Sequence, residues 1–385
     1  MLNGPELEAT AAWIASLQLG NGMIPWFPGG HADPWNHTEA AMALVVTGRV
    51  AEAESAYRWL ASTQLADGSW CLYHLAEGIE EPRRDPNVCA YVATGVWWHY
   101  LETGDVALLE RMWPVVGGAV EFVLGLQEPG GEVLWKRDVD GRPGSFALLT
   151  ANASMYHSLR CALAMGNVLG HGRPEWEMGI ARVGHAVAQR RAAFERKDRG
   201  AMDWYYPVLS GAVTGGEAVD ALAQRWEDFV IDGVGVRCVG DEGWVTTAET
   251  AECVMALDAA GLEERAITML GWTRHLRHDD GSYWTGCVHP QCVRYPGGER
   301  SSYGAAAVIM AHHVLSGRGG ASGLFRGEGL PAALRTRKAD QALASDNRVG
   351  DVIEAGRTSP LPSDKGLSEA SAEELIAEVQ AGRGR

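Results

Sequence analysis

Two kinds of helical segment alternate along this chain of 385 residues. The first kind carries apolar residues at three- and four-residue spacing and a charged opposite face, over residues 6–18, 50–64, 106–126, 174–196, 216–230 and 262–277. The second kind is apolar or small all round, over residues 35–48, 86–101, 147–167, 204–215, 246–260 and 301–316. Because a helix without a polar face is buried, the pattern predicts six inner helices, each covered by an outer one. This is an all-α double ring, the (α/α)6 toroid, whose inner helices would line a central cavity.

A short turn that contains glycine and ends in an aromatic residue recurs between these helices. Three clear copies, each with glutamine first and tryptophan last, cover residues 18–26, 64–70 and 127–135, and two weaker copies cover 240–244 and 279–284. Self-similarity of this kind indicates a repeat architecture in which each unit packs on its neighbours.

The helical pattern ends near Leu315, so we predict one catalytic toroid over residues 1–316. From residue 317 to 385 the chain is rich in Gly, Ala, Ser, Arg and Glu and has almost no aromatic residues. This composition is typical of a flexible tail. One short helix is expected in it, over residues 371–379, and a helix docked on the toroid is the alternative.

The formal net charge of −16 argues against nucleic acid as a partner, since binding to phosphates depends on basic contacts and no Lys/Arg stripe is present. The chain shows no signal peptide and no apolar run of about 18 residues that could span a bilayer. Seven cysteines, an odd number, suit buried thiols in a reducing compartment. We therefore expect a cytoplasmic protein, and the oligomeric state stays open.

One cluster of cysteines could form a metal-binding site. Cys287, His289 and Cys292 offer three soft ligands within six residues. A structural zinc site needs a fourth ligand, and this spacing matches neither a finger nor a ribbon. We therefore expect a loop packed by cysteines, and no metal or organic cofactor is implied.

The loops that lead into the inner helices are unusually rich in polar and aromatic residues. In chain order they offer His31, Asp33, Trp35, Asn36, His37, Asp85, Asn87, Trp135, Asp138, Tyr205, Trp244, Glu249, Glu252, Trp284 and His289. Aromatic faces stack on sugar rings, amides and carboxylates bind hydroxyls, and two carboxyl groups can cleave a glycosidic bond. Since these loops are expected to meet at one mouth of the ring, they favour a carbohydrate site.

Each carboxylate also has a purely structural interpretation. Asp33 and Asp85 each precede a proline at the start of an apolar helix, as an N-cap residue would. Glu249 follows Thr246 at capping-box spacing. Glu252 aligns within the repeat with Glu39, so each of these two glutamates either faces the cavity or has a buried partner, and we favour the cavity.

The turns resemble those of the prenyltransferase and squalene-cyclase superfamily, but the chemistry of that superfamily does not carry over. Its cyclases need an Asp-x-Asp-Asp acid motif, and the nearest segment, Asp138-Val-Asp140-Gly141, lacks the last member. The protein prenyltransferases need a zinc site of Asp, Cys and His, and the sequence offers no recognisable set of these ligands.

A second resemblance is to glucoamylase-like (α/α)6 glycosidases. Arg84-Asp85-Pro86 is similar to their Arg-Asp-x-Pro segment, and Leu134-Trp135 begins a loop similar to their Leu-Trp-Glu loop. Lys136 stands where that loop carries the general acid, so the acid must be Asp138 or come from another loop. In overall character the chain also resembles the methylmannose polysaccharide α-endomannosidases, which implies an endo-acting α-(1,4)-mannosidase on a partly O-methylated mannan.

Together these features favour an inverting glycoside hydrolase, in which one carboxylic acid protonates the leaving oxygen and one carboxylate activates water. We expect Asp33 as acid and Glu249 as base, with Glu252 as the other candidate and an exchange of roles possible. Trp35, Trp135, Trp244 and Trp284 would stack on sugar rings, and Asn36, Asp85, Asn87 and Tyr205 would bind hydroxyls. Two alternatives remain: a prenyl-chain-binding protein of the terpene-cyclase type, and a non-catalytic carbohydrate-binding toroid whose carboxylates all serve as caps or arginine partners.

Overall fold

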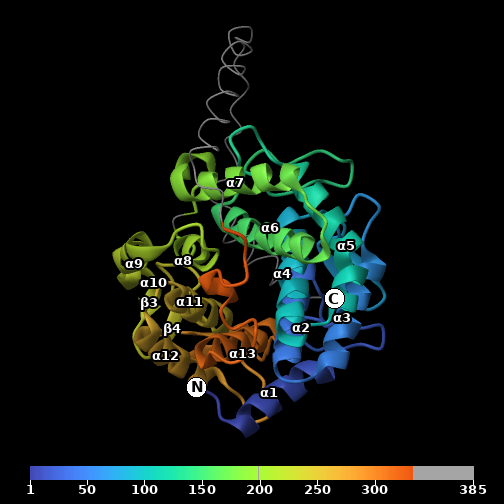
Figure 1. Cartoon of the computed structure of the whole chain (residues 1–385). Coiled ribbons are helices and arrows are strands. Elements are labelled where there is room, and N and C mark those ends of the chain that lie inside the picture. The colour runs from blue at the N-terminus through green and yellow to red at the C-terminus, as the bar shows by residue number, and fades with distance from the viewer. Residues whose placement is uncertain (198, 333–385) are drawn as a thin grey trace. The chain divides into compact units, whose positions relative to one another are not determined.

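The computed structural model describes residues 1–197 and 199–332, which contain thirteen α-helices. Six of these helices are largely buried: α2 (Pro34–Val46), α4 (Pro86–Thr103), α6 (Leu149–Leu169), α8 (Met202–Leu209), α11 (Thr247–Ala259) and α13 (Ser302–Ser316). Each contacts the next in this order, and α13 contacts α2, so the inner helices form a closed circuit (Figure 1). Their bounds agree with the predicted inner segments to within a few residues, except that α8 ends at Leu209 rather than near residue 215.

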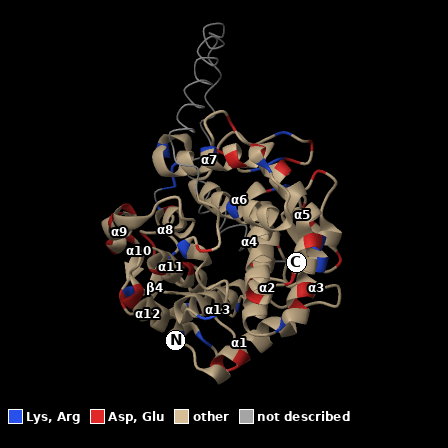
Figure 2. Ribbon diagram, in the orientation of Figure 1, with Lys and Arg blue, Asp and Glu red and all other residues tan. Residues whose placement is uncertain are grey.

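A second set of helices lies outside the first. It consists of α1 (Gly4–Leu17), α3 (Val50–Thr63), α5 (Val106–Leu124), α7 (Pro174–Gln189), α9 (Gly215–Gln224) and α12 (Glu263–Trp272). Each covers an inner helix: α1 packs on α13 and α2, and the others pack on α2, α4, α6, α8 and α11, respectively. Most charged residues lie on these peripheral helices and on the loops (Figure 2). Among the described helices, none combines the length and the apolar character needed to cross a membrane.

Three peripheral helices end earlier than predicted, and a short helix follows each of them. These short elements are η1 (Arg191–Ala193) after α7, α10 (Trp226–Phe229) after α9, and η2 (Thr273–Leu276) after α12. In each of these segments the amphipathic pattern is continuous along the sequence, although the helix itself is interrupted.

The glycine turns fasten each outer helix to the next one. Gln64 Nε2 donates to the Gly68 carbonyl at 2.9 Å, within the turn, and to the Val115 carbonyl of α5 at 2.8 Å. Gly68 has a φ of +83°, and a Cβ there would lie 2.1 Å from the Gly118 carbonyl oxygen, so glycine is required for the turn to sit on α5. Gln18 and Gln127 make the same pair of bonds toward α3 and α7.

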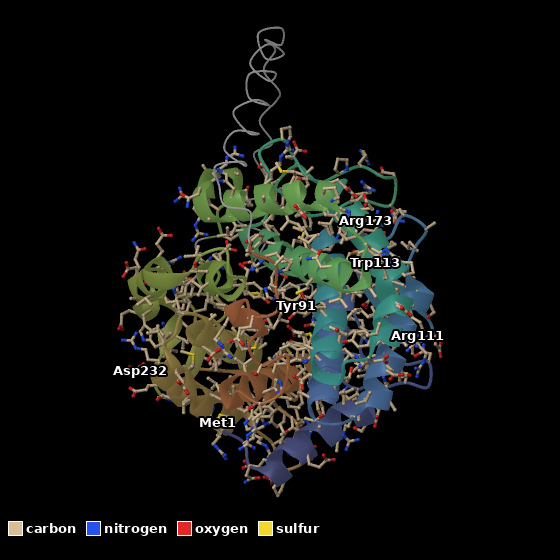
Figure 3. The ribbon with its side chains drawn as sticks, in the orientation of Figure 1. Met1, Tyr91, Arg111, Trp113, Arg173 and Asp232 are labelled. Carbon is tan, nitrogen blue, oxygen red and sulfur yellow. The ribbon has the colours of Figure 1, made fainter. Side chains whose placement is uncertain are left out.

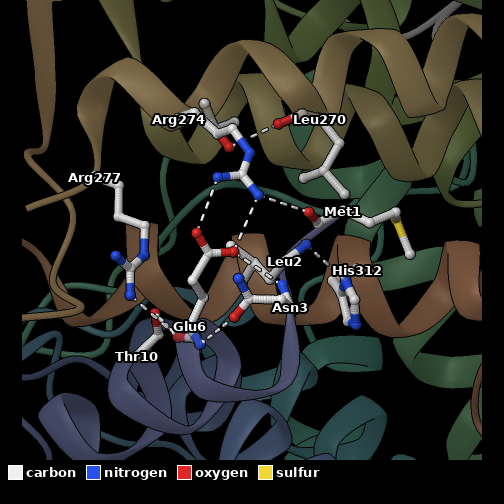
Figure 4. A network of polar contacts seen from close by, with 10 residues as sticks. Met1, Leu2, Asn3, Glu6, Thr10, Leu270, Arg274, Arg277 and His312 are labelled. Atoms are coloured by element: carbon white, nitrogen blue, oxygen red, sulfur yellow. Dashed lines mark hydrogen bonds and ion pairs between the residues drawn. The ribbon is translucent and has the colours of Figure 1, made fainter.

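The last turn and the N-terminus close the outer layer. A Cβ on Gly281 would lie 2.5 Å from the backbone of Ala9 in α1, as the other turn glycines approach their neighbouring helices. Glu6 of α1, whose backbone N–H is capped by Asn3, forms an ion pair with Arg274 of η2 at 3.0 Å (Figure 4). The Leu2 N–H donates to Nδ1 of His312 in α13. The first helix is therefore bound to the last ones, as a ring of repeats requires.

The expectation of a purely helical chain needs one correction, because two small antiparallel sheets form in the loops. One pairs β1 (Tyr73–Leu75) with β2 (Gly78–Glu81). The other has the order β3 (Val230–Ile231), β4 (Gly235–Arg237), β5 (Trp244–Thr246), β6 (Gly286–Val288) and β7 (Val293–Arg294). Val236, Val245 and Cys287 in this sheet are fully buried, and buried backbone needs hydrogen-bond partners. Strand pairing supplies those partners in loops too long for a single turn.

The chain remains packed beyond α13. Phe325 in η3 (Leu324–Arg326) stacks on His157 of α6, with ring centroids 5.1 Å apart, and Arg326 pairs with Asp258 of α11 at 2.7 Å. The remainder of the predicted tail, including the helix expected over residues 371–379, lies outside the described residues.

Candidate active site

Asp33 is the N-cap residue of α2 and the most heavily hydrogen-bonded of the candidate acids. Its Oδ1 accepts the backbone N–H groups of Trp35 at 2.7 Å and Asn36 at 3.1 Å, and its Oδ2 accepts from the Asn36 amide and the Trp26 indole. Only 2% of Asp33 is exposed. This burial raises the pKa of the carboxyl group, while the Trp26 and Asn36 donors oppose the rise. Asp33 is therefore both a cap and a perturbed acid.

Two further carboxyl groups, Glu39 on α2 and Glu252 on α11, are also buried in the inner layer. Burial raises the pKa of Glu39 to about 7, and the charge of Asp33 adds to the rise. Burial also raises the pKa of Glu252 well above its usual range, and the charge of Glu39 contributes. The two glutamates that align in the sequence repeat therefore lie close enough across the ring to interact.

Both of these glutamates have buried hydrogen-bond partners. Glu252 accepts the hydroxyl groups of Tyr205 and Tyr206, and Glu39 accepts from the Trp35 indole and from Tyr91. Tyr91, labelled in Figure 3, comes from α4 and lies near the middle of the ribbon, whereas Arg111 and Arg173 lie at the periphery. The buried-partner interpretation of Glu39 and Glu252 is the one that the contacts support.

Glu249 occupies a more accessible place than Glu252, one turn earlier on α11. It is half-buried, and its carboxylate accepts the hydroxyl of Thr246, whose oxygen in turn accepts the Glu249 N–H at 3.2 Å. Thr246 therefore caps α11, but the second bond of a capping box, from the Thr246 backbone N–H to the Glu249 carboxylate, is not among the hydrogen bonds of the described residues. The charge of Glu249 adds to the burial that raises the pKa of Tyr303 on α13, and the Tyr303 ring lies 5.2 Å from that of Trp26. Trp26 therefore contacts both Asp33 and Tyr303, and the charge of Glu249 reaches Tyr303.

The loop before α4 adds a fourth group of residues to this site. Asp85 caps α4 by accepting the Asn87 N–H at 2.8 Å, and burial raises its pKa to about 6, with a further rise from the charge of Asp33. The Asn87 side-chain oxygen is buried and has no hydrogen-bond partner among the described residues. His31 pairs with Glu80 of β2 at 2.7 Å. The loops before α2 and α4 thus share one polar surface.

The other predicted site residues make no hydrogen bond to these carboxylates in the described chain, although Arg83, two residues before Asp85, lies over the Trp135 ring at 5.0 Å. Trp135 stacks on Phe146, and Asp138 pairs with Lys136 at 2.8 Å, so the alternative acid is held by a neighbouring cation. Trp244 contacts Tyr295, and Trp284 contacts His278 and Arg300.

Two histidines of the predicted set are placed in different surroundings. His37 is fully buried, and its two ring nitrogens contact the Ile24 N–H and the Ala56 carbonyl, which leaves neither nitrogen for a substrate. His289 is half-buried in the turn between β6 and β7, and its Nδ1 has no partner among the described residues.

Sequence reasoning missed the aromatic residues that connect the carboxylates. Tyr91 and Tyr303 come from two different inner helices, and no local pattern marks them, whereas Tyr206 adjoins the predicted Tyr205 on α8. Trp26 had a signal, since it ends the first glycine turn. Two surface pockets of about 310 and 450 Å³ lie elsewhere and contain none of these site residues.

The cysteine cluster singled out in the sequence belongs to the described part of the chain. Nowhere in it do three His, Cys, Asp or Glu side chains gather so that they could hold a metal ion, and this includes the segment from Cys287 to Cys292. All seven cysteines are free.

Comparison with known proteins gives the family. No family model matches the chain. It is 48% identical over 334 residues to the MMP endo-(1,4)-3-O-methyl-alpha-D-mannosidase of Mycolicibacterium hassiacum, covering 87% of this chain and 92% of that protein.

Solved structures show a similar fold at low sequence identity. The GH63 mannosylglycerate hydrolase from Thermus thermophilus matches with a TM-score of 0.63 and 15% identity, over 79% of this chain and 99% of the other. A wild-type glycosidase matches with a TM-score of 0.61 and 16% identity, over 86% and 100%. The helix-rich fold is therefore one that glycosidases use, and by its sequence the chain belongs to the family of the MMP endo-(1,4)-3-O-methyl-alpha-D-mannosidase.

Proposed function

We propose that this protein is an endo-acting glycoside hydrolase that cleaves α-(1,4) bonds between 3-O-methylated mannose units, with inversion. The closed circuit of six inner helices and their six outer partners supports an (α/α)6 toroid as its fold. The named relative supports the substrate and the endo mode of action. The seven free thiols support a reducing compartment such as the cytoplasm.

The observation that carries the mechanism is the place of Trp26, which donates to the buried Asp33 and lies against Tyr303, a tyrosine that the charge of the more accessible Glu249 reaches. Asp33 has the raised pKa that a general acid needs, since such an acid must keep its proton until the bond breaks. Glu249 is half-buried and can meet a water molecule as general base. Glu252 suits neither role, because both of its oxygens already accept tyrosine hydroxyls in a buried place.

The surrounding residues fit a methylated sugar. The half-buried Trp26 and Trp35 rings flank Asp33 and offer apolar faces to a pyranose ring and its methyl groups. Asn36, Asp85 and Asn87 offer hydrogen bonds to free hydroxyls. A prenyl chain would meet five carboxyl groups here (Asp33, Glu39, Asp85, Glu249 and Glu252), which makes the prenyl-binding alternative a poor fit.

The test is hydrolysis of methylmannose polysaccharide, followed by mass spectrometry of the products and by proton NMR of the first anomer formed. We expect oligosaccharides of intermediate length and a β-anomer that appears before mutarotation. Release of single sugars would contradict endo action, an α-anomer would contradict inversion, and binding without hydrolysis would favour the non-catalytic toroid.

A further inference from the structure

Glu39 is a buried carboxyl group that the proposed mechanism does not use. It lies on α2 and is 2% exposed. Its Oε1 accepts both the Trp35 indole N–H at 2.9 Å and the Tyr91 hydroxyl at 3.2 Å. No described residue donates a hydrogen bond to its Oε2, and no basic side chain of the described chain pairs with it. A buried acid without a cation is costly to keep, so its place next to the candidate site calls for an explanation.

Trp35 links Glu39 to Asp33. The backbone N–H of Trp35 donates to Asp33 Oδ1 at 2.7 Å, while its indole N–H donates to Glu39. The indole ring stacks on Tyr91, with centroids 5.0 Å apart and planes 25° apart. It forms a T-shaped contact with Tyr206, with centroids 5.7 Å apart. Glu39 and Tyr91 together therefore fix the plane of the indole, and the same tryptophan helps to fix Asp33.

We propose that Glu39 is a positioning residue for hydrolysis. It holds the Trp35 indole beside Asp33 as a sugar platform, that is, a flat ring on which a sugar can stack. Its negative charge also helps Asp33 to keep its proton. This inference rests on the proposed function of Asp33 as general acid. Glu39 itself would touch neither the leaving oxygen nor the attacking water.

Burial, with a smaller contribution from the charge of Asp33, brings the pKa of Glu39 close to neutral pH. The titratable groups that face it are Asp33 from its own helix, Tyr91 from α4, Tyr206 from α8 and Glu252 from α11. Tyr303 of α13 contacts Trp26, the tryptophan that donates to Asp33. The helices α1 and α3 cover the outer side of α2 (Figure 1). With only acids and phenols around it, Glu39 has a pKa raised by burial to about 7. Its charge therefore appears in the pH range in which Asp33 must stay protonated.

The decisive variants are Glu39→Gln and Glu39→Leu. Glutamine keeps an oxygen acceptor for Trp35 and removes the charge, so we expect a fall in kcat of about tenfold at neutral pH and an alkaline limb of the rate profile that moves to lower pH. Leucine also removes the acceptor, so we expect in addition a rise in KM of about fivefold, because the sugar platform is no longer fixed.

Thr38→Val is the matched control. Thr38 is fully buried on the same turn of α2 and donates to the Pro34 carbonyl at 2.6 Å. It contacts neither Trp35 nor Asp33 in any hydrogen bond of the described chain. We expect this variant to lose some stability and to keep the wild-type pH profile, so a shift of the profile in it as well would overturn the inference.

A readout without substrate separates this inference from the proposed function. The Trp35 indole N–H signal, assigned by its loss in Trp35→Phe, should titrate with a midpoint near pH 7 in the wild type and stop doing so in Glu39→Gln. A wild type that hydrolyses no methylated mannan but shows this titration would refute the proposed function and support the anchoring of Trp35. Wild-type kinetics and an unchanged indole signal in Glu39→Gln would overturn the inference and leave the function standing.

Discussion

The indole N–H of Trp26 donates to Oδ2 of Asp33. Trp26 ends the first glycine turn, and Asp33 begins the inner helix that follows it. The turn therefore does more than join two helices: it places an aromatic donor on the candidate acid. The Ser302 N–H, at the start of α13, donates to the Trp26 carbonyl at 2.7 Å, which fixes this tryptophan between the first and last inner helices.

Asp33→Asn should remove hydrolysis and keep the fold. Asparagine caps a helix about as well as aspartate, so the bonds from the Trp35 and Asn36 backbone can persist, but an amide cannot protonate the leaving oxygen. We expect kcat to fall about 10³-fold and the melting temperature to fall modestly, because the new amide NH2 group faces the Trp26 and Asn36 donors that bind Oδ2. Enzyme assays and circular dichroism measure the two effects, and an active Asp33→Asn protein would exclude this residue as the acid.

Trp26→Phe should move the alkaline limb of the rate profile in the direction opposite to Glu39→Gln. The Trp26 hydrogen bond favours the charged form of Asp33 and so lowers its pKa. Without this bond the acid keeps its proton to higher pH, and the limb moves up. The measurement is kcat/KM across the range from acid to mildly alkaline pH, and a shift of both variants in one direction would show that the limb does not report Asp33.

Gly68→Ala should destabilise the protein by about 3 kcal/mol. The cost combines the positive φ of +83° with the approach of the new Cβ to the Gly118 carbonyl of the next outer helix. Gly78→Ala is the control, because a Cβ there has no atom within 4 Å and the backbone of β2 is extended. Urea unfolding of both variants gives the comparison, and equal stabilities would mean that the turn does not hold the outer layer.

Glu39→Gln should change stability in a pH-dependent way. The folded-state pKa of Glu39 is raised from 4.5 to about 7, so ionisation of this group opposes folding increasingly as the pH rises from about 4.5 to 7 and fully above that range. The variant lacks this penalty. Relative to wild type it should gain up to about 3 kcal/mol between about pH 4.5 and about pH 8, which thermal unfolding at the two pH values can measure. A constant difference would place the ionisation outside this range.

The pattern of the sequence predicted the helices well because their burial is periodic. The alternation of amphipathic and apolar segments located all twelve ring helices, and the repeated Gln–Gly–Trp turns indicated that each unit rests on the next. It did not predict the two sheets. Their strands are two to four residues long, too short for a period to be recognised.

For the candidate site, the sequence by itself determined which carboxylates stand at the starts of inner helices: Asp33, Asp85 and Glu249. It also aligned Glu39 with Glu252 and favoured a cavity as what both side chains face. Only the tertiary structure revealed their hydrogen-bond partners. Tyr91 donates to Glu39 from 52 residues away, and Tyr206 donates to Glu252 from 46 residues away. Local pattern fixes which face of a helix is buried, whereas the pKa of a buried acid depends on donors and charges that only the closure of the ring brings into contact.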